Sequence, residues 1–154
     1  MVDNPPDPGL YRWVIERFPE AWLEDPALTP GTEALLEPHA DRVTWDAPIH
    51  SVADIEGLRW PPKTVNVKPS RFGSVERLFA TYDYCERHGI DAYGGGQWEL
   101  GIGRGHIQLL AALFHPETPN DVAPGGYNAT EPPTGLPTSP LTVRARETGF
   151  AAVS

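Results

Sequence analysis

Three ionisable residues, Glu24, Asp46 and Lys68, each end a segment that reads as a β-strand, and equal steps of 22 residues separate them. Strands at a regular interval, with helical segments between them, are typical of repeated βα units whose strands are parallel. In such sheets the catalytic groups gather at the carboxyl ends of the strands. We therefore expect two carboxylates and one amine to meet at one edge of a sheet.

The segment that ends in Lys68 has one polar and one apolar face. Thr64, Asn66 and Lys68 alternate with two valines, and alternate residues of a strand point to opposite faces. A polar face that ends in an amine is explained if it looks into a pocket, where Asn66 would contact a substrate. The alternative is that Lys68 is a surface residue whose aliphatic stem lies along the protein.

The two carboxylates also have a simpler interpretation. In that interpretation Glu24 is a solvated charge at a strand end, and Asp46 is a turn former before Ala47 and Pro48. The spacing alone does not exclude it.

Six glycines stand close together, at positions 94, 95, 96, 101, 103 and 105. Glycine lets the backbone approach a ligand closely, and the N–H groups at the start of a following helix favour anions. We expect Gly96, Gln97 and Glu99 to contact a substrate, whereas the alternative is an ordinary turn between a strand and a helix. The stretch is neither a dinucleotide fingerprint nor a phosphate loop, because no Gly-Lys-Ser/Thr follows. Among the histidines, only His50 is placed to touch a substrate.

Strand-like and helix-like segments alternate from residue 8 to residue 124. Apolar residues at helical spacing predict helices over residues 8–18, 30–40, 51–58, 74–88 and 107–114. Alternating or short apolar runs predict strands over residues 21–24, 42–46, 64–68, 90–93 and 120–124. We expect one α/β domain over residues 1–128 and an irregular, proline-rich tail over residues 129–154.

Composition narrows the class of protein. The formal net charge of −9 argues against nucleic acid or an anionic membrane as a partner. The one cysteine, Cys85, lies on the apolar stripe of its helix, so we expect inert packing in a cytoplasmic protein without disulfides. Neither a leader nor an apolar run long enough to cross a membrane is evident. With 154 residues the chain is too short for a complete (β/α)8 barrel, which takes about 250 residues.

Three motifs, in one order and spacing, resemble a known family. They are Val-Asn-Val-Lys-Pro-Ser-Arg-Phe-Gly (65–73), Cys-Glu-Arg-His-Gly-Ile (85–90) and Gly-Gly-Gly-Gln-Trp-Glu-Leu-Gly-Ile-Gly-Arg (94–104). Together they are similar to the sixth and seventh barrel strands of the enolase superfamily. Within that superfamily they resemble in particular the branch of o-succinylbenzoate synthase and N-acylamino acid racemase.

The resemblance implies roles for the three strand-end residues. Glu24 and Asp46 match two carboxylates of the family's Mg²⁺ site, which lie on the fourth and fifth strands. Lys68 matches the sixth-strand lysine, which serves as acid or base or as a cation beside the enolate. Neighbouring cations and the metal are expected to lower its pKa. One departure is that the family often has Asp-Glu on the fifth strand, where this sequence has Asp46 and Ala47.

The implied fold is a partial (β/α)8 TIM-type barrel, covering about strands four to eight of the enolase C-terminal domain. The implied reaction is Mg²⁺-assisted removal of a proton α to the carboxylate of a small substrate, followed by elimination or racemisation. The third metal carboxylate, the Lys-x-Lys of the second strand and the capping domain are not found in the sequence. We therefore expect the chain alone to be inactive, and to form a homo-oligomer or associate with a missing N-terminal half.

Two alternatives remain open. The first is a non-catalytic truncated half-barrel, or a subunit that needs a partner chain. The second is an α/β domain of unrelated function.

Overall fold

The computed structural model describes residues 4–122, 126–127, 129–146 and 149–152, in which helices and strands alternate along most of the chain. The α-helices are α1 (Pro8–Arg17), α2 (Pro30–Leu36), α3 (Val52–Glu56), α4 (Val75–His88) and α5 (Gly101–Phe114), and the 3-10 helices are η1 (Glu37–Arg42) and η2 (Pro69–Arg71). The strands are β1 (Leu23–Glu24), β2 (Val43–Thr44), β3 (Thr64–Val67), β4 (Asp91–Gly94), β5 (Val143–Arg146) and β6 (Gly149–Ala152).

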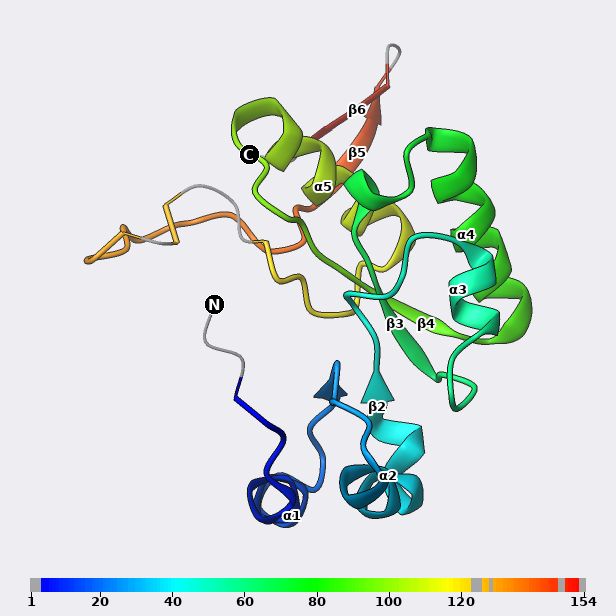
Figure 1. Ribbon diagram of the computed structural model, residues 1–154. Coiled ribbons are helices and arrows are strands. Elements are labelled where there is room, and N and C mark those ends of the chain that lie inside the picture. Colours follow the sequence, from blue (N-terminus) through cyan, green and yellow to red (C-terminus); the bar gives the residue numbers. More distant parts are fainter. Residues whose placement is uncertain (1–3, 123–125, 128, 147–148, 153–154) are drawn as a thin grey trace.

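The first four strands lie in parallel, in their order along the chain (Figure 1). β1 pairs with β2, and β3 pairs with β4. A parallel bridge between Trp45 and Val65 joins the two pairs, and the Asn66 N–H donates to the Trp45 carbonyl at 2.9 Å. A second parallel bridge places Asn120 beside Gly94 of β4. The carboxyl ends of these strands therefore lie along one edge.

Local signals in the sequence set the ends of the helices. Ser51 and Ser74 are the N-caps of α3 and α4, and each hydroxyl accepts a hydrogen bond of 3.3 Å from the N–H three residues on. α4 ends at Gly89, whose φ of 64° lies in the left-handed region that glycine adopts at little cost. Arg87 and His88 stand in the last turn of α4, where positive charge is favourable.

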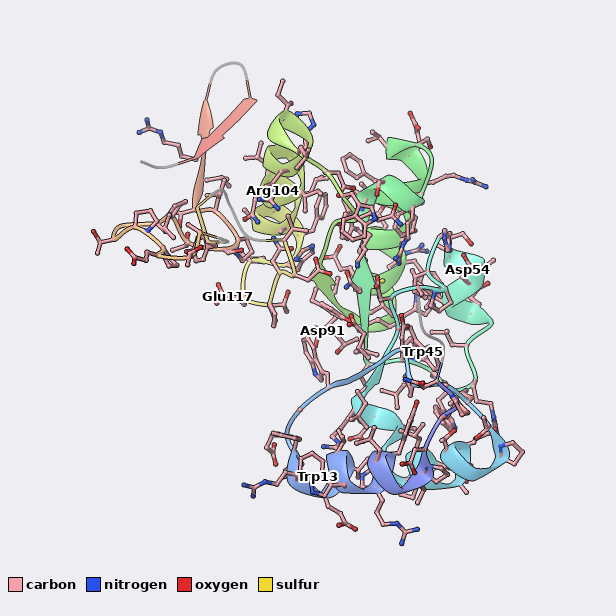
Figure 2. All side chains as sticks on the ribbon, turned by 60° about the vertical axis from the view of Figure 1, so that its left-hand side comes forward. Trp13, Trp45, Asp54, Asp91, Arg104 and Glu117 are labelled. Atoms are coloured by element: carbon pink, nitrogen blue, oxygen red, sulfur yellow. The ribbon has the colours of Figure 1, made fainter. Side chains whose placement is uncertain are left out.

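The core lies between the strands and the helices that cover them. Val65, Asn66 and Val67 are all fully buried, so both faces of β3 are covered. Trp45, labelled in Figure 2, is 8% exposed and lies between the part with α1 and α2 and the part with β3 and β4. Cys85 is buried on α4, and burial raises the pKa of its thiol to about 11, so the inert packing expected for it agrees with the structure.

The strands differ from the prediction mainly in length. β1 and β2 keep only two residues each, and β1 ends at Glu24, because the φ of 46° at the next residue, Asp25, does not continue an extended strand. The expected last strand over residues 120–124 is reduced to the bridge at Asn120, and residues 123 and 124 lie outside the described part of the chain.

The tail over residues 129–154 is not irregular throughout, which corrects the sequence prediction. β5 and β6 pair as an antiparallel hairpin. In β5, Val143 and Ala145 alternate with two arginines, a period-two pattern that the surrounding prolines obscured. Separately, none of the helices in the described residues combines the length and the apolarity needed to cross a membrane.

Candidate active site

Lys68 directly follows β3 and contacts two carboxylates. Its Nζ lies 2.9 Å from Asp46 Oδ2 and 3.1 Å from Asp121 Oδ2. The side chains of Lys68 and Asp46 are only 11% and 14% exposed, whereas that of Asp121 is 40% exposed. Water screens a partly buried ion pair less than a surface pair. The Lys68 amine therefore forms ion pairs with Asp46, after β2, and with Asp121, after the bridge at Asn120, at the carboxyl edge of the strands.

The two carboxylates that contact its amine raise the pKa of Lys68, and the lowering expected beside cations and a metal stays a prediction. Burial lowers the pKa of the amine, but hydrogen bonds to Asp46 and Asp121, together with the negative charges of these groups, outweigh burial. The expectation assumed that cations and a metal would be the neighbours of Lys68, whereas the groups in contact with its amine are carboxylates. At neutral pH Lys68 is therefore an ammonium ion in this arrangement, which makes it a proton donor.

Asp46 is fixed through its side chain and its backbone. Arg71 Nη1, on η2, donates to Asp46 Oδ1 at 2.7 Å and also to the Asp46 carbonyl. The backbone N–H groups of Asp46 and Ala47 donate to the two carboxylate oxygens of Asp25, each at 2.8 Å. These bonds connect the end of β1 to the end of β2, and they stabilise the positive φ of Asp25, which is uncommon outside glycine.

Glu24, at the end of β1, receives two hydrogen bonds at one oxygen. Tyr93 Oη donates to Glu24 Oε1, and Asn66 Nδ2 donates to the same oxygen at 3.3 Å. Asn66 Nδ2 also lies 3.4 Å from Asp121 Oδ2, so this buried amide links Glu24 to the ion pair of Lys68. Glu24 is exposed, unlike the groups that hold it.

The glycine-rich loop after β4 closes on Asp121. The Gly96 N–H donates to Asp121 Oδ1 at 3.1 Å, and a Cβ at Gly95 would lie 2.5 Å from each carboxylate oxygen of Asp121. Farther along the loop, the Gln97 N–H donates to Glu99 Oε2 at 2.6 Å. Beside Asp121 is a cavity of about 330 Å³, lined by Gly96, Gln97, Trp98, Glu99, Leu100, Arg104, Asp121 and Val122.

The hydrogen bonds found for His50 among the described residues are to its own turn and not to this cluster. Its backbone N–H donates to Asp54 Oδ2 at 3.0 Å, and its ring Nδ1 lies 3.0 Å from the Pro48 carbonyl. Both contacts belong to the turn that starts α3. The substrate contact expected at His50 stays a prediction, because neither of these hydrogen bonds tests it.

Three residues that were not predicted from the sequence also belong to the cluster: Arg71, Tyr93 and Asp121. Asn66 and Tyr93 are register partners in the β3–β4 pair, so both lie on the same face of the sheet. Asp121 lies inside the expected last strand, 120–124, and in the structure it directly follows the bridge at Asn120, so the shorter strand puts it at a strand end. Arg71 lies within the quoted motif, but its direction depends on the turn of η2 after Pro69.

The carboxylates suit a hard divalent cation, although their set is incomplete. Glu24, Asp46 and Asp121 offer oxygen donors, which Mg²⁺ prefers. Asn66 Oδ1 is another oxygen of the same cluster, buried and without a hydrogen-bond partner among the described residues. Within the described ranges, however, no three His, Cys, Asp or Glu side chains are grouped closely enough to hold a metal ion. The donor chemistry fits Mg²⁺, and further ligands would have to be added.

Comparison with known proteins gives the family. A family model described as "Domain of unknown function (DUF8230) C-terminal domain" matches residues 1–129. The chain belongs to this family. Its described function is unknown, so the family alone assigns no activity to the cluster.

Curated relatives cover a smaller part of the chain. Over 61 residues, 40% of the chain, it is 34% identical to an o-succinylbenzoate synthase of Bacillus subtilis (strain 168). Over 67 residues, 44% of the chain, it is 37% identical to an N-succinylamino acid racemase of Amycolatopsis sp. Over 84 residues, 53% of the chain, it is 31% identical to an o-succinylbenzoate synthase of Listeria innocua. These matches span only 16%, 17% and 22% of the relatives' own lengths.

A solved structure shares the fold. It is a member of the enolase superfamily from Listeria innocua, 24% identical, with a TM-score of 0.62. The match covers 79% of this chain and 35% of the Listeria chain. Together with the curated relatives, it confirms the resemblance to the enolase superfamily over part of the chain. The shared fold is an α/β fragment.

Replacing Gly95 with alanine should lower the free energy of unfolding by about 1–3 kcal/mol, because the new methyl group would overlap the Asp121 carboxylate. To avoid this overlap the Asp121 carboxylate would have to move, which should also break its contact with Lys68. Gly105→Ala is the matched control, since nothing lies within 4 Å of its Cβ and alanine favours the helix. Urea unfolding of both variants checks the prediction, and equal stability of Gly95→Ala and the wild type would contradict it.

Proposed function

We propose that this chain carries part of the active site of a Mg²⁺-dependent lyase or racemase that removes a proton α to a carboxylate. The fold proposed for residues 4–122 is a sector of a (β/α)8 barrel, with β1 to β4 and the Asn120 bridge as strands four to eight. One observation carries the proposal: Lys68 contacts Asp46 and Asp121, and Asn66 links this group to Glu24, all at the carboxyl edge of parallel strands. Active sites of βα barrels lie at that edge.

Glu24 and Asp46 would hold the metal, with Asn66 Oδ1 and Asp121 as further oxygen donors close by. When bound, Mg²⁺ supplies a Lewis acid that stabilises negative charge on the substrate carboxylate. The α-proton would pass to a base outside this chain, the Lys-x-Lys of the second strand that the resemblance implies. Lys68, charged in this arrangement, would place a positive charge beside the developing enediolate and could return a proton to it. Asp46 and Asp121 fix the position of Nζ, and Arg71 fixes Asp46.

The substrate proposed is a small carboxylate that enters the cavity beside Asp121. Gly96, Gln97 and Glu99 line it, as does Arg104 on the first turns of α5. Arg104 Nε is buried and has no hydrogen-bond partner among the described residues, which supports an anionic group as its partner. α5 itself has no side-chain cap and no acidic residue in its first turn, so its N-terminal end also favours negative charge.

Metal binding tests the first half of the proposal. The whole chain should bind Mn²⁺, a spectroscopic substitute for Mg²⁺, as measured by the loss of the free-ion signal in electron paramagnetic resonance. Asp46→Asn and Glu24→Gln should each weaken binding at least about tenfold, because each removes a charged ligand. Asp41→Asn is the control, since Asp41 is 58% exposed and pairs with Lys63, which precedes β3 while Lys68 follows it. No binding by the wild-type chain would remove the metal from the proposal.

Proton transfer tests the second half. In a chimera, residues 4–122 would replace the corresponding segment of the Amycolatopsis N-succinylamino acid racemase, which supplies the rest of a complete enzyme. The chimera should exchange the α-proton of an N-succinylamino acid with deuterium from the solvent, in a Mg²⁺-dependent manner. A folded chimera that binds Mn²⁺ and exchanges no proton would contradict catalysis.

A second candidate is a non-catalytic half-barrel that needs a partner chain, either another copy of itself or the missing N-terminal half. Several large apolar side chains are exposed, among them Trp98 (93%), Leu100 (81%) and Ile102 (80%) at the start of α5. Exposed apolar side chains favour association. Light scattering on residues 1–154 distinguishes a monomer from an oligomer, while the chimera decides whether the cluster is catalytic.

A further inference from the structure

Tyr93 joins β4 to the ends of two other strands through one buried hydroxyl group. Tyr93 is 6% exposed, and its Oη donates to Glu24 Oε1. The same Oη accepts a hydrogen bond of 3.3 Å from Thr44 Oγ1, and Thr44 is 1% exposed. A carboxylate accepts hydrogen bonds and cannot donate them, so the direction from Thr44 through Tyr93 to Glu24 is fixed. The ring of Trp22 packs against that of Tyr93, with centroids 5.1 Å apart.

The two oxygens of Glu24 therefore have different surroundings. Oε1 accepts from Tyr93 and from Asn66, which uses both of its lone pairs. For Oε2 no hydrogen bond is found among the described residues. Because Glu24 is exposed while its two donors are buried, the carboxylate is anchored on the inner side and open on the outer side.

From this geometry we propose that Tyr93 is a positioning residue that presents Glu24 Oε2, as a single-oxygen ligand, to the divalent cation of the proposed site. This inference rests on the proposed function and adds a residue that acts through Glu24 without touching the metal. Partners that orient a ligand in this way typically contribute 10- to 100-fold to metal affinity. Asn66 shares the task from β3, whereas Thr44 acts one step farther away by orienting the Tyr93 hydroxyl.

The test measures Mn²⁺ affinity of the whole chain by electron paramagnetic resonance. Tyr93→Phe removes only the hydroxyl and should raise the Mn²⁺ dissociation constant about tenfold. Thr44→Val should have a smaller effect in the same direction. Tyr84→Phe is the matched control, because Tyr84 lies on α4 and its hydroxyl makes no hydrogen bond with the described residues; its affinity should equal that of the wild type.

A double-mutant cycle separates positioning from general loosening of the fold. In a Glu24→Gln background, Tyr93→Phe should cause no further loss of Mn²⁺ affinity, because the ligand through which it acts is gone. Equal losses in both backgrounds would overturn the inference, since they would indicate a structural role only. If Glu24→Gln weakens binding while Tyr93→Phe does not, this inference fails and the proposed function stands. If the wild-type chain binds no Mn²⁺, both fail.

Discussion

Replacing Lys68 with alanine should lower α-proton exchange in the chimera by about 10²–10⁴-fold, the usual contribution of a proton-transfer residue. The Mn²⁺ affinity of the same variant should stay the same or increase. The reason is that the amine now bonds to Asp46 Oδ2 and Asp121 Oδ2, and its removal frees both oxygens. Replacing Lys68 should therefore lower proton exchange without weakening metal binding, whereas replacing Glu24 or Asp46 should weaken metal binding.

Folding has to be separated from chemistry in this experiment. Lys68 is 11% exposed, and its removal leaves two carboxylates less well paired, so the alanine variant should also be less stable. Lys68→Met keeps most of the side-chain volume and should show the same loss of exchange with a smaller loss of stability. Lys63→Ala is the control, because Lys63 is 69% exposed and its pair with Asp41 lies on the surface. Exchange at the wild-type rate in Lys68→Met would remove the lysine from the mechanism.

The contact between Lys68 and Asp46 could be predicted from the sequence because it depends on the regular interval between strands. Equal steps of 22 residues, with helices between them, require parallel strands whose ends align. The helix signals were equally local: Ser51 and Ser74 start helices, and Gly89 ends one. The strand interval and the helix caps depend only on residues close together in the sequence. Their prediction therefore holds even though β1 and β2 are shorter than expected.

The rest of the cluster depends on contacts that no local pattern contains. Asp121 reaches Lys68 only because the loop at Gly95 and Gly96 closes around it, 25 residues earlier in the chain. Tyr93 faces Glu24 because β4 pairs with β3 in one register, and a shift of one residue would turn it to the other face. The raised pKa of Lys68 was not predicted for the same reason, since its second carboxylate partner, Asp121, was not identified from the sequence.

The face of β4 opposite Tyr93 packs against a residue whose expected effect is on stability. His115 follows α5, is 5% exposed, and its Nδ1 has no hydrogen-bond partner among the described residues. A Cβ at Gly94 would lie 2.5 Å from its ring, and the ring centroid of Tyr82 is 5.9 Å away. It lines a cavity of about 450 Å³ together with four carboxylates, those of Asp83, Glu86, Asp91 and Glu117, the last near Asp91 in Figure 2.

Burial lowers the pKa of His115 to about 4, from an ordinary value of 6.5, because the charged ring would lose its hydration. Above pH 6.5 the ring is neutral in both the folded and the unfolded chain, and no stability is lost. As the pH falls from about 6.5 to about 4, His115 becomes protonated in the unfolded chain but stays largely neutral in the folded chain. The free energy of unfolding should therefore fall by up to about 3 kcal/mol over this range. The four carboxylates attract an imidazolium ion, so this value is an upper limit.

Urea unfolding at pH 7.0 and pH 4.5 measures the effect. The wild-type chain should lose stability between the two conditions, and His115→Leu, which cannot take up a proton, should lose less by about 2–3 kcal/mol. Carboxylates elsewhere titrate in both proteins alike, so the difference between the two losses belongs to His115. His106→Gln is the control, because His106 is exposed on α5 and its replacement should leave the wild-type loss unchanged. Equal losses in the wild type and His115→Leu would show that the buried ring does not set the acid sensitivity of the fold.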